Sequence, residues 1–180
     1  MRRVLVSLTA ACAALFAATV PAGAAGSAGT ASDAATDGGT GWEPAPSPSW
    51  SYPAGVRCDF AVQGAPVVDE VVRRTVAAYP NGTKLVEYKG ALVVRVVNTA
   101  TGASYDADAS GHALVELRPD RSQRWYVFGP ILAGFGTDGG NVPRGLYTLD
   151  GAYTLDVSTT GYKTLTMLDG TTDPLCDKVA

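Results

Sequence analysis

The feature that most constrains the fold is the short spacing of β-branched residues and turns after residue 58. Apolar residues there alternate with polar ones or form brief valine-rich runs, and turn residues interrupt them every eight to twelve positions. This spacing is typical of β-sandwiches and β-barrels. Parallel strands need crossover connections of about a dozen or more residues, which are missing here. We therefore predict an all-β domain over 56–180, a single antiparallel β-sandwich or barrel of about eight strands.

The expected strands are separated by recognisable turns, such as Pro80–Thr83 and Thr99–Gly102. Strands are predicted over 71–76, 84–89, 91–98, 103–109, 112–118, 123–129, 147–157 and 162–168, and a long Gly-rich loop over 135–145. Two points stay open. The first strand has charges that also suit a helix, although its valines favour a strand. Asp150–Gly151 suits either a β-bulge or a two-residue hairpin.

The N-terminal residues have the three parts of a secretory signal peptide. Arg2 and Arg3 precede the uncharged apolar run Val4–Val20, and small residues at 22–24 offer a cleavage site. The run is short for a transmembrane helix. We therefore predict a signal peptide over 1–24 and an extracellular protein with no membrane span in its mature part. The paired arginines leave the general and the twin-arginine export routes open.

Residues 25–55 are predicted to form a disordered spacer rich in Gly, Ala and Pro. The segment has no aliphatic side chain larger than alanine, so it buries too little apolar surface to offset the entropy of ordering. Its aromatic residues Trp42, Trp50 and Tyr52 either contact a partner such as cell-wall glycan, or they dock on the domain surface or have no role at all. We favour the second alternative, docking on the domain or no role.

Two cysteines, Cys58 and Cys176, lie at the two ends of the predicted domain. In an exported protein such a pair indicates a disulfide. Neither cysteine belongs to a C-x-x-C pair or has a histidine nearby in the sequence, which argues against a redox or metal site. We predict a Cys58–Cys176 disulfide.

Composition excludes several classes of function. Charged residues make up 17 % and the formal net charge is −3, whereas nucleic-acid binding needs clustered Lys and Arg. The single histidine, His112, excludes a two-histidine metal site. Asp106, Asp108 and Ser110 fit the first half of a calcium loop, but Leu117 stands where the bidentate Glu is required. They are a weak calcium candidate, and we expect no metal and no cofactor.

Catalytic patterns are weak throughout the chain. There is no G-x-S-x-G motif around His112. Carboxylates that could pair as in a glycosidase exist at Glu87, Glu116, Asp106 and Asp150, but their spacing selects none. Pro143-Arg144-Gly145 in the Gly-rich loop would suit a protease-inhibitor loop, which is a minor alternative. Whether the protein is an enzyme stays open, with a non-enzymatic role favoured.

The order of turns and cysteines resembles that of a group of short secreted all-β proteins of high-GC actinobacteria. The residues that carry the resemblance are Cys58, Asn98–Gly102, Ser110–Gly111, the Gly-rich loop and Leu175–Cys176. The resemblance implies an exported all-β domain and carries no catalytic residue with it.

Aromatic residues gather in the second half of the chain, where they form either a core or the lining of a cavity for a small apolar or sugar ligand. The candidates are Trp125, Tyr126, Phe128, Phe135, Tyr147 and Tyr153. The favoured function is a secreted, non-enzymatic interaction or binding module, expected to be a monomer. Its partner would be an extracellular protein, a cell-wall glycan or a small molecule. The alternative is a ligand-binding β-barrel, and an enzyme on that scaffold is less favoured.

Overall fold

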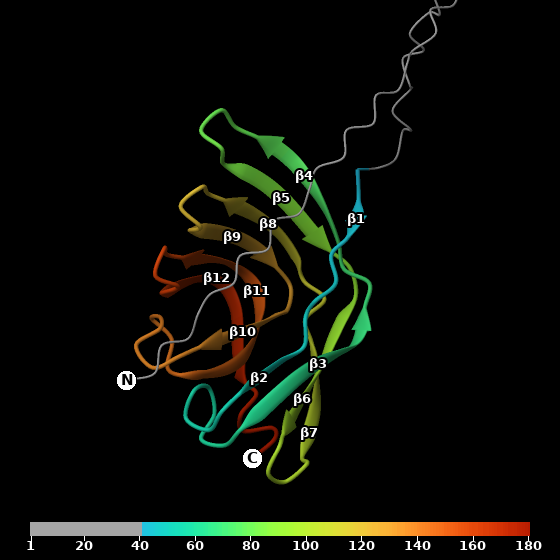
Figure 1. Ribbon diagram of the computed structural model, residues 1–180, viewed down its shortest axis with the longest axis vertical. Helices are drawn as coiled ribbons and strands as arrows, with labels where there is room; N and C mark the ends of the chain where they lie inside the picture. Colours follow the sequence, from blue (N-terminus) through green and yellow to red (C-terminus); the bar gives the residue numbers. More distant parts are fainter. Residues whose placement is uncertain (1–40) are drawn as a thin grey trace, which may run out of the picture. The chain divides into compact units, whose positions relative to one another are not determined.

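A computed structural model describes residues 41–180, which form twelve strands in two antiparallel sheets (Figure 1). The predicted all-β class and antiparallel pairing are confirmed. The signal peptide predicted over 1–24 and the spacer up to residue 40 lie outside the described residues. None of the described residues belongs to a helix.

The larger sheet has eight strands in the order β1-β4-β5-β8-β9-β11-β10, with β12 also paired to β11, and the smaller has the order β2-β3-β6-β7. The strands of the first half are β1 (Glu43–Pro44), β2 (Trp50–Tyr52), β3 (Val62–Asp69), β4 (Val72–Ala78), β5 (Lys84–Lys89) and β6 (Leu92–Asn98). Those of the second half are β7 (Ser104–Asp108), β8 (His112–Leu117), β9 (Gln123–Phe128), β10 (Ile131–Phe135), β11 (Gly145–Val157) and β12 (Lys163–Pro174).

The two sheets belong to one meander of long, bent strands. Only two or three residues separate β3 from β4, β5 from β6, β7 from β8 and β9 from β10, so each pair continues one strand through a corner. Backbone N–H groups join neighbouring corners, Glu70 to Ala91, Ala109 to Leu92, Gly111 to Pro130 and Gly129 to Gly151. The corners therefore form a row across neighbouring strands. The four strands beyond the eight predicted are β1, β2 and β10, which were not predicted, and β3, which was not predicted as a strand separate from β4.

Glycines at this row allow β11 and β12 to pass each other closely. Gly151 and Gly170 are paired, with φ angles of +126° and +141°. A Cβ on Gly151 would overlap the Asp169 carbonyl, and one on Gly170 would overlap the Asp150 carbonyl. β11 runs unbroken through this point, with a register shift after Ala152. Asp150–Gly151 is therefore part of a bulged strand and not a hairpin turn.

The buried apolar residues form two clusters. The terminal cluster draws on both ends of the described chain and comprises Cys58, Val62, Val94, Val96, Ala107, Leu146, Leu175 and Val179. The meander cluster comprises residues from neighbouring strands, Ala113, Val115, Val127, Ala133, Phe135, Leu149, Tyr153 and Leu155. Inward and outward residues alternate along each strand, so the predicted alternation places these side chains correctly.

The predicted disulfide joins Cys58 to Cys176 across a sequence separation of 118 residues, with the Cα atoms 5.6 Å apart. It fixes the C-terminal segment against the terminal cluster. Asn98 supports the same closure, because its buried amide donates a 3.0 Å hydrogen bond to the Val179 carbonyl. Both ends of the described chain are thereby tied to one core.

The boundary of the Gly-rich loop differs from the prediction. Phe135 ends β10 and Gly145 begins β11, and the two residues are register partners. The strand β10 was not predicted, because Gly129-Pro130 and Gly134 interrupt its apolar run. The last strand also extends six residues beyond Leu168, since its second half pairs with the first half of β11.

The prediction of a disordered spacer up to residue 55 is wrong for its last part. Residues 43–52, here called the N-terminal arm, add β1 to β4 and β2 to β3 (Figure 1). The Trp42 ring contacts two cations. The guanidinium carbon of Arg74 lies 4.6 Å from the ring centroid and the Nζ of Lys89 lies 4.3 Å from it. Trp50 packs on the terminal cluster. The aromatic residues thus order a segment that has no aliphatic core residues, and of the two outcomes grouped in the favoured alternative the structure has docking on the domain.

Candidate functional site

A cavity of about 550 Å³ lies between the N-terminal arm and the inner face of the meander. Its walls come from both clusters. Trp50, Leu92, Val94 and Leu132 belong to or pack on the terminal cluster, and Tyr88, Trp125, Ile131 and Leu155 belong to or pack on the meander cluster. The cavity is therefore the space that the two clusters leave between them.

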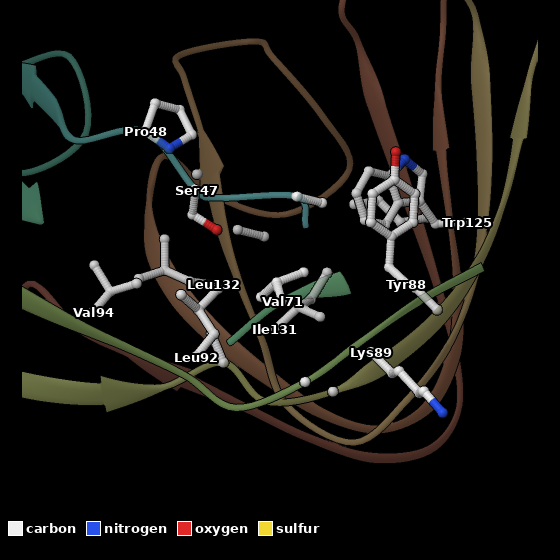
Figure 2. Close-up of a pocket in the computed structure, with 18 of the residues that line it drawn as sticks. Ser47, Pro48, Val71, Tyr88, Lys89, Leu92, Val94, Trp125, Ile131 and Leu132 are labelled. Atoms are coloured by element: carbon white, nitrogen blue, oxygen red, sulfur yellow. The ribbon is translucent and has the colours of Figure 1, made fainter. Parts of the chain in front are cut away.

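The arm forms the cover of this cavity. Ala45, Pro46, Ser47 and Pro48 contribute to the lining, and Figure 2 shows Ser47 and Pro48 across the cavity from Leu92 and Leu132. Prolines at 44, 46 and 48 have no N–H to donate. The remaining N–H groups of Ala45 and Ser47 bond to the Val71 carbonyl at 2.8 Å and the Asp69 carboxylate at 2.6 Å. Few hydrogen bonds thus hold the middle of the arm, between Trp42, which directly precedes it, and Trp50.

Two aromatic rings form one end of the cavity. Tyr88 and Trp125 stack with centroids 6.1 Å apart and an interplanar angle of 14° (Figure 2). The Trp125 indole N–H donates to the Gln123 side chain at 2.8 Å, so that amide oxygen already has a partner. The side chains that face the cavity are otherwise mainly aliphatic. The arrangement is suited to an apolar molecule.

Lys163 is the cation on the inner face of the cavity wall. Its Nζ donates to the Gly134 carbonyl at 2.9 Å and lies 5.9 Å from the Phe135 ring centroid. Partial burial lowers the pKa of Lys163, and the nearby positive charge of Arg57 lowers it further. The other lysine of the lining, Lys89, directs its Nζ to the Trp42 ring.

The structure brings only one of the six predicted aromatic residues into the cavity, Trp125. Tyr126 and Phe128 are exposed on the opposite face of the sheet. Phe135 and Tyr153 are fully buried in the meander cluster, and burial raises the pKa of Tyr153. Tyr147 packs edge-on against Phe135 and donates its hydroxyl hydrogen to the Pro143 carbonyl. Most of the predicted set is core or outer surface.

Sequence reasoning missed Tyr88, Lys163 and the arm as parts of the site. The alternation of side chains along a strand could have divided the predicted aromatic set, because Trp125 and Tyr126 must face opposite sides of one strand. Tyr88 has the same parity as the buried Val86 on β5, which marks it as inward-facing. No sequence pattern indicates that the arm covers this face, since its contacts are long-range.

The candidate catalytic residues lie outside the cavity, in ion pairs. His112 Nε2 is 2.8 Å from Glu87 Oε1, and Arg74 contacts the other oxygen of that carboxylate at 2.6 Å. The hydrogen bond from Arg74 lowers the pKa of Glu87, and Arg95 does the same for Asp106. A glycosidase acid needs a raised pKa. Glu116 is paired with Arg118, and Asp150 is exposed.

The weak calcium candidate is occupied by other contacts. Both oxygens of Asp106 accept bonds of 2.7 Å from Arg95. Asp108 accepts the Ser110 backbone N–H, and the Ser110 hydroxyl bonds to the backbone of Leu92. Within residues 41–180, no three His, Cys, Asp or Glu side chains are grouped as metal ligands. The three residues thus serve the β6–β7 pairing and the corner after it.

The Gly-rich loop does not present Arg144 as a free inhibitor residue. Arg144 is partly buried, pairs with Asp59 and donates to the Arg57 carbonyl at 3.4 Å. The loop is fixed at Asn141, whose side chain exchanges two hydrogen bonds of 2.8 Å with the Leu165 backbone. This loop supports the segment around Cys58.

Over the part of the chain that the structure describes, no helix has the length and apolar character needed to cross a membrane. No family model matches the chain, and neither a curated protein nor a solved structure matches it.

Proposed function

We propose that the protein is an exported, non-enzymatic binding module whose ligand is a small, largely apolar molecule held under the N-terminal arm. The observation that carries this proposal is the cavity of about 550 Å³, lined in part by the arm, a size within the usual range of about 300–1,000 Å³ for ligand pockets. Export rests on the signal peptide predicted over 1–24. An extracellular protein or a cell-wall glycan as partner stays a prediction from the sequence.

The lining supports an apolar ligand over a sugar. Sugars need several hydrogen-bonding side chains around them, but the walls are mainly Leu, Val, Ile and Ala with the Tyr88–Trp125 pair. The Gln123 amide is already bonded to Trp125. Transfer of an apolar molecule from water into such a cavity contributes roughly 25 cal/mol per Å² of buried apolar surface.

The charged residues support a non-enzymatic role. The one imidazole, His112, bonds to a carboxylate on the exposed side of the sheet, away from the cavity lining. The carboxylates with lowered pKa values, Glu87 and Asp106, are held by arginines and are poor proton donors at neutral pH.

The proposal is tested by titrating the folded, disulfide-bonded protein with the neutral fluorescent amine N-phenyl-1-naphthylamine. We expect saturable one-to-one binding with enhanced probe emission. Leu132→Trp places a larger side chain into the cavity and should weaken probe binding by about tenfold or more, because ligand and side chain compete for one volume.

The matched control is Leu168→Trp, the same substitution at a leucine that is 75 % exposed on β12. It should leave probe affinity unchanged. If Leu132→Trp fails to fold, Leu92→Trp on another wall of the cavity serves the same purpose. Absence of probe binding, or equal loss in Leu132→Trp and Leu168→Trp, would contradict the proposal.

A further inference from the structure

Lys163 and a second cation, Arg57, flank the same residue of the cavity wall, Gly134. Lys163 begins β12 and shares its parity with Leu165 and Met167, which pack on the meander cluster, so its side chain faces inward. Its Nζ bonds to the carbonyl oxygen of Gly134. A Cβ placed on Gly134 would lie 2.8 Å from Arg57 Nε. Arg57 therefore passes directly over this glycine.

Arg57 is held in place by covalent and aromatic contacts. It precedes Cys58, whose disulfide fixes the segment to the C-terminal end. Its guanidinium carbon lies 4.7 Å from the Tyr52 ring centroid, and one terminal nitrogen donates to the Val56 carbonyl. Its Nε is buried and has no hydrogen-bond partner. A buried donor without an acceptor is costly, so the fold leaves the Nε–H group of Arg57 uncompensated.

No carboxylate of residues 41–180 forms an ion pair with either cation. Six other arginines are paired with acidic residues, namely Arg73, Arg74, Arg95, Arg118, Arg124 and Arg144. Arg121 has no such pair either, but it is exposed, whereas Arg57 and Lys163 are both partly buried. The charge of Arg57 also reaches Lys163, since it contributes to the lowered pKa of that lysine. Partly buried cations without a counter-charge favour the binding of an anion close to them.

The geometry points to a ligand with two parts, and we propose that the cavity binds a single-tailed anionic amphiphile. Its tail lies along the aliphatic walls and the Tyr88–Trp125 pair, and its carboxylate or phosphate head group lies at Lys163. Arg57 is not part of the cavity lining, and it adds its positive charge from beside Gly134. Lys89 does not take this role, because its Nζ lies on Trp42, and Figure 2 shows its side chain directed away from Leu92 and Ile131. The inference rests on the proposed function and names the chemical class of its ligand.

The test compares three ligands with the same tail, sodium decanoate, decyl phosphate and decanol, below their micellar concentrations. Each displaces N-phenyl-1-naphthylamine from the disulfide-bonded protein at pH 7. We expect at least one of the two anions to bind about tenfold or more tightly than decanol, and added salt to weaken the anions alone. A preference for decanoate would assign a carboxylate head group, and a preference for decyl phosphate a phosphate.

Two lysine variants provide the matched comparison. Lys163→Met should reduce affinity for the preferred anion to about the affinity that the same variant has for decanol. Lys84→Met changes an exposed lysine outside the cavity lining and should leave the preference for the anion intact. Arg57→Met should reduce the anion's advantage as Lys163→Met does, without affecting decanol.

The outcomes separate the two proposals. If neither the probe nor any decyl ligand binds, the proposed function fails. If the probe and decanol bind but neither anion binds more tightly than decanol, the head-group site is wrong and the apolar cavity stands. An equal loss of anion affinity in Lys163→Met and Lys84→Met would also overturn the head-group site.

Discussion

The terminal cluster and the meander cluster contain similar side chains but are closed in different ways. The meander cluster takes its buried residues from 113 to 155, on the consecutive strands β8 to β11. The terminal cluster joins residue 58 to residues 175 and 179, and a disulfide lies within it. Closing a longer loop costs more chain entropy. The disulfide therefore lies in the cluster whose residues are farthest apart in the sequence.

The largest expected effect comes from removing this covalent closure. The double variant Cys58→Ser/Cys176→Ser should lose about 4–5 kcal/mol of unfolding free energy, because the disulfide closes a loop of more than a hundred residues. Urea denaturation measures the loss. Wild-type protein treated with reductant is the control and should match the variant. A loss under about 1 kcal/mol would mean that the terminal cluster closes without the disulfide.

A smaller effect distinguishes the two clusters directly. Leu149→Ala, in the meander cluster, should cost about 3 kcal/mol, since Leu149 is completely buried. The cost should be the same with and without the disulfide. Leu175→Ala, in the terminal cluster beside Cys176, should cost about as much in the disulfide-bonded protein but less in Cys58→Ser/Cys176→Ser.

Denaturant curves are measured for wild type, for Cys58→Ser/Cys176→Ser, and for each leucine variant with and without the disulfide. They give one coupling energy for Leu149 and one for Leu175. A coupling of about 0.5 kcal/mol or more is expected for Leu175 and a value near zero for Leu149. Equal coupling at both leucines would show that the clusters unfold as one unit and would remove the distinction between them.

The smallest effect concerns Lys163, the charged residue beside the meander cluster. Its pKa is lowered in the folded protein, mainly by burial and also by Arg57. Between that lowered pKa and the ordinary value of 10.5, the unfolded chain binds more protons at this lysine, so stability rises with pH there. Below the lowered pKa, Lys163 is charged in both the folded and the unfolded protein, and the folded state bears the full cost of burying that charge.

Lys163→Met removes this titration. The stability difference between wild type and Lys163→Met should therefore shift in favour of wild type as pH approaches 10.5, as measured by denaturation at a series of pH values. Lys84→Met, at an exposed strand end, is the control and should give no such trend. A difference that does not change with pH would contradict the assigned burial of Lys163.

Much of the fold was predictable because it depends on local rules. Alternation along β5, β6, β8 and β9 identified the strands, and turn residues identified their ends. The Cys58–Cys176 pair followed from cysteine number and predicted export. The corners were not predictable as corners, since Gly129-Pro130 has the same composition whether the chain turns back or bends and continues.

The site was less predictable than the fold. Trp125 and Phe128 are both aromatic and close in sequence, but one lines the cavity and the other is 61 % exposed on the outer face. The arm was predicted to be disordered from its composition. Its order depends on partners far along the chain, such as Gly64 opposite Trp50 and the two cations around Trp42.

The sequence by itself determined the all-β class, the antiparallel pairing and the disulfide, because period-two alternation, turn chemistry and cysteine pairing act locally or through a single covalent bond. Only the tertiary structure decided that the arm covers the inner face, that a cavity remains between two clusters, and that Lys163 and Arg57 meet at Gly134. These features depend on how bent strands and distant segments pack, and packing joins residues that no sequence pattern connects.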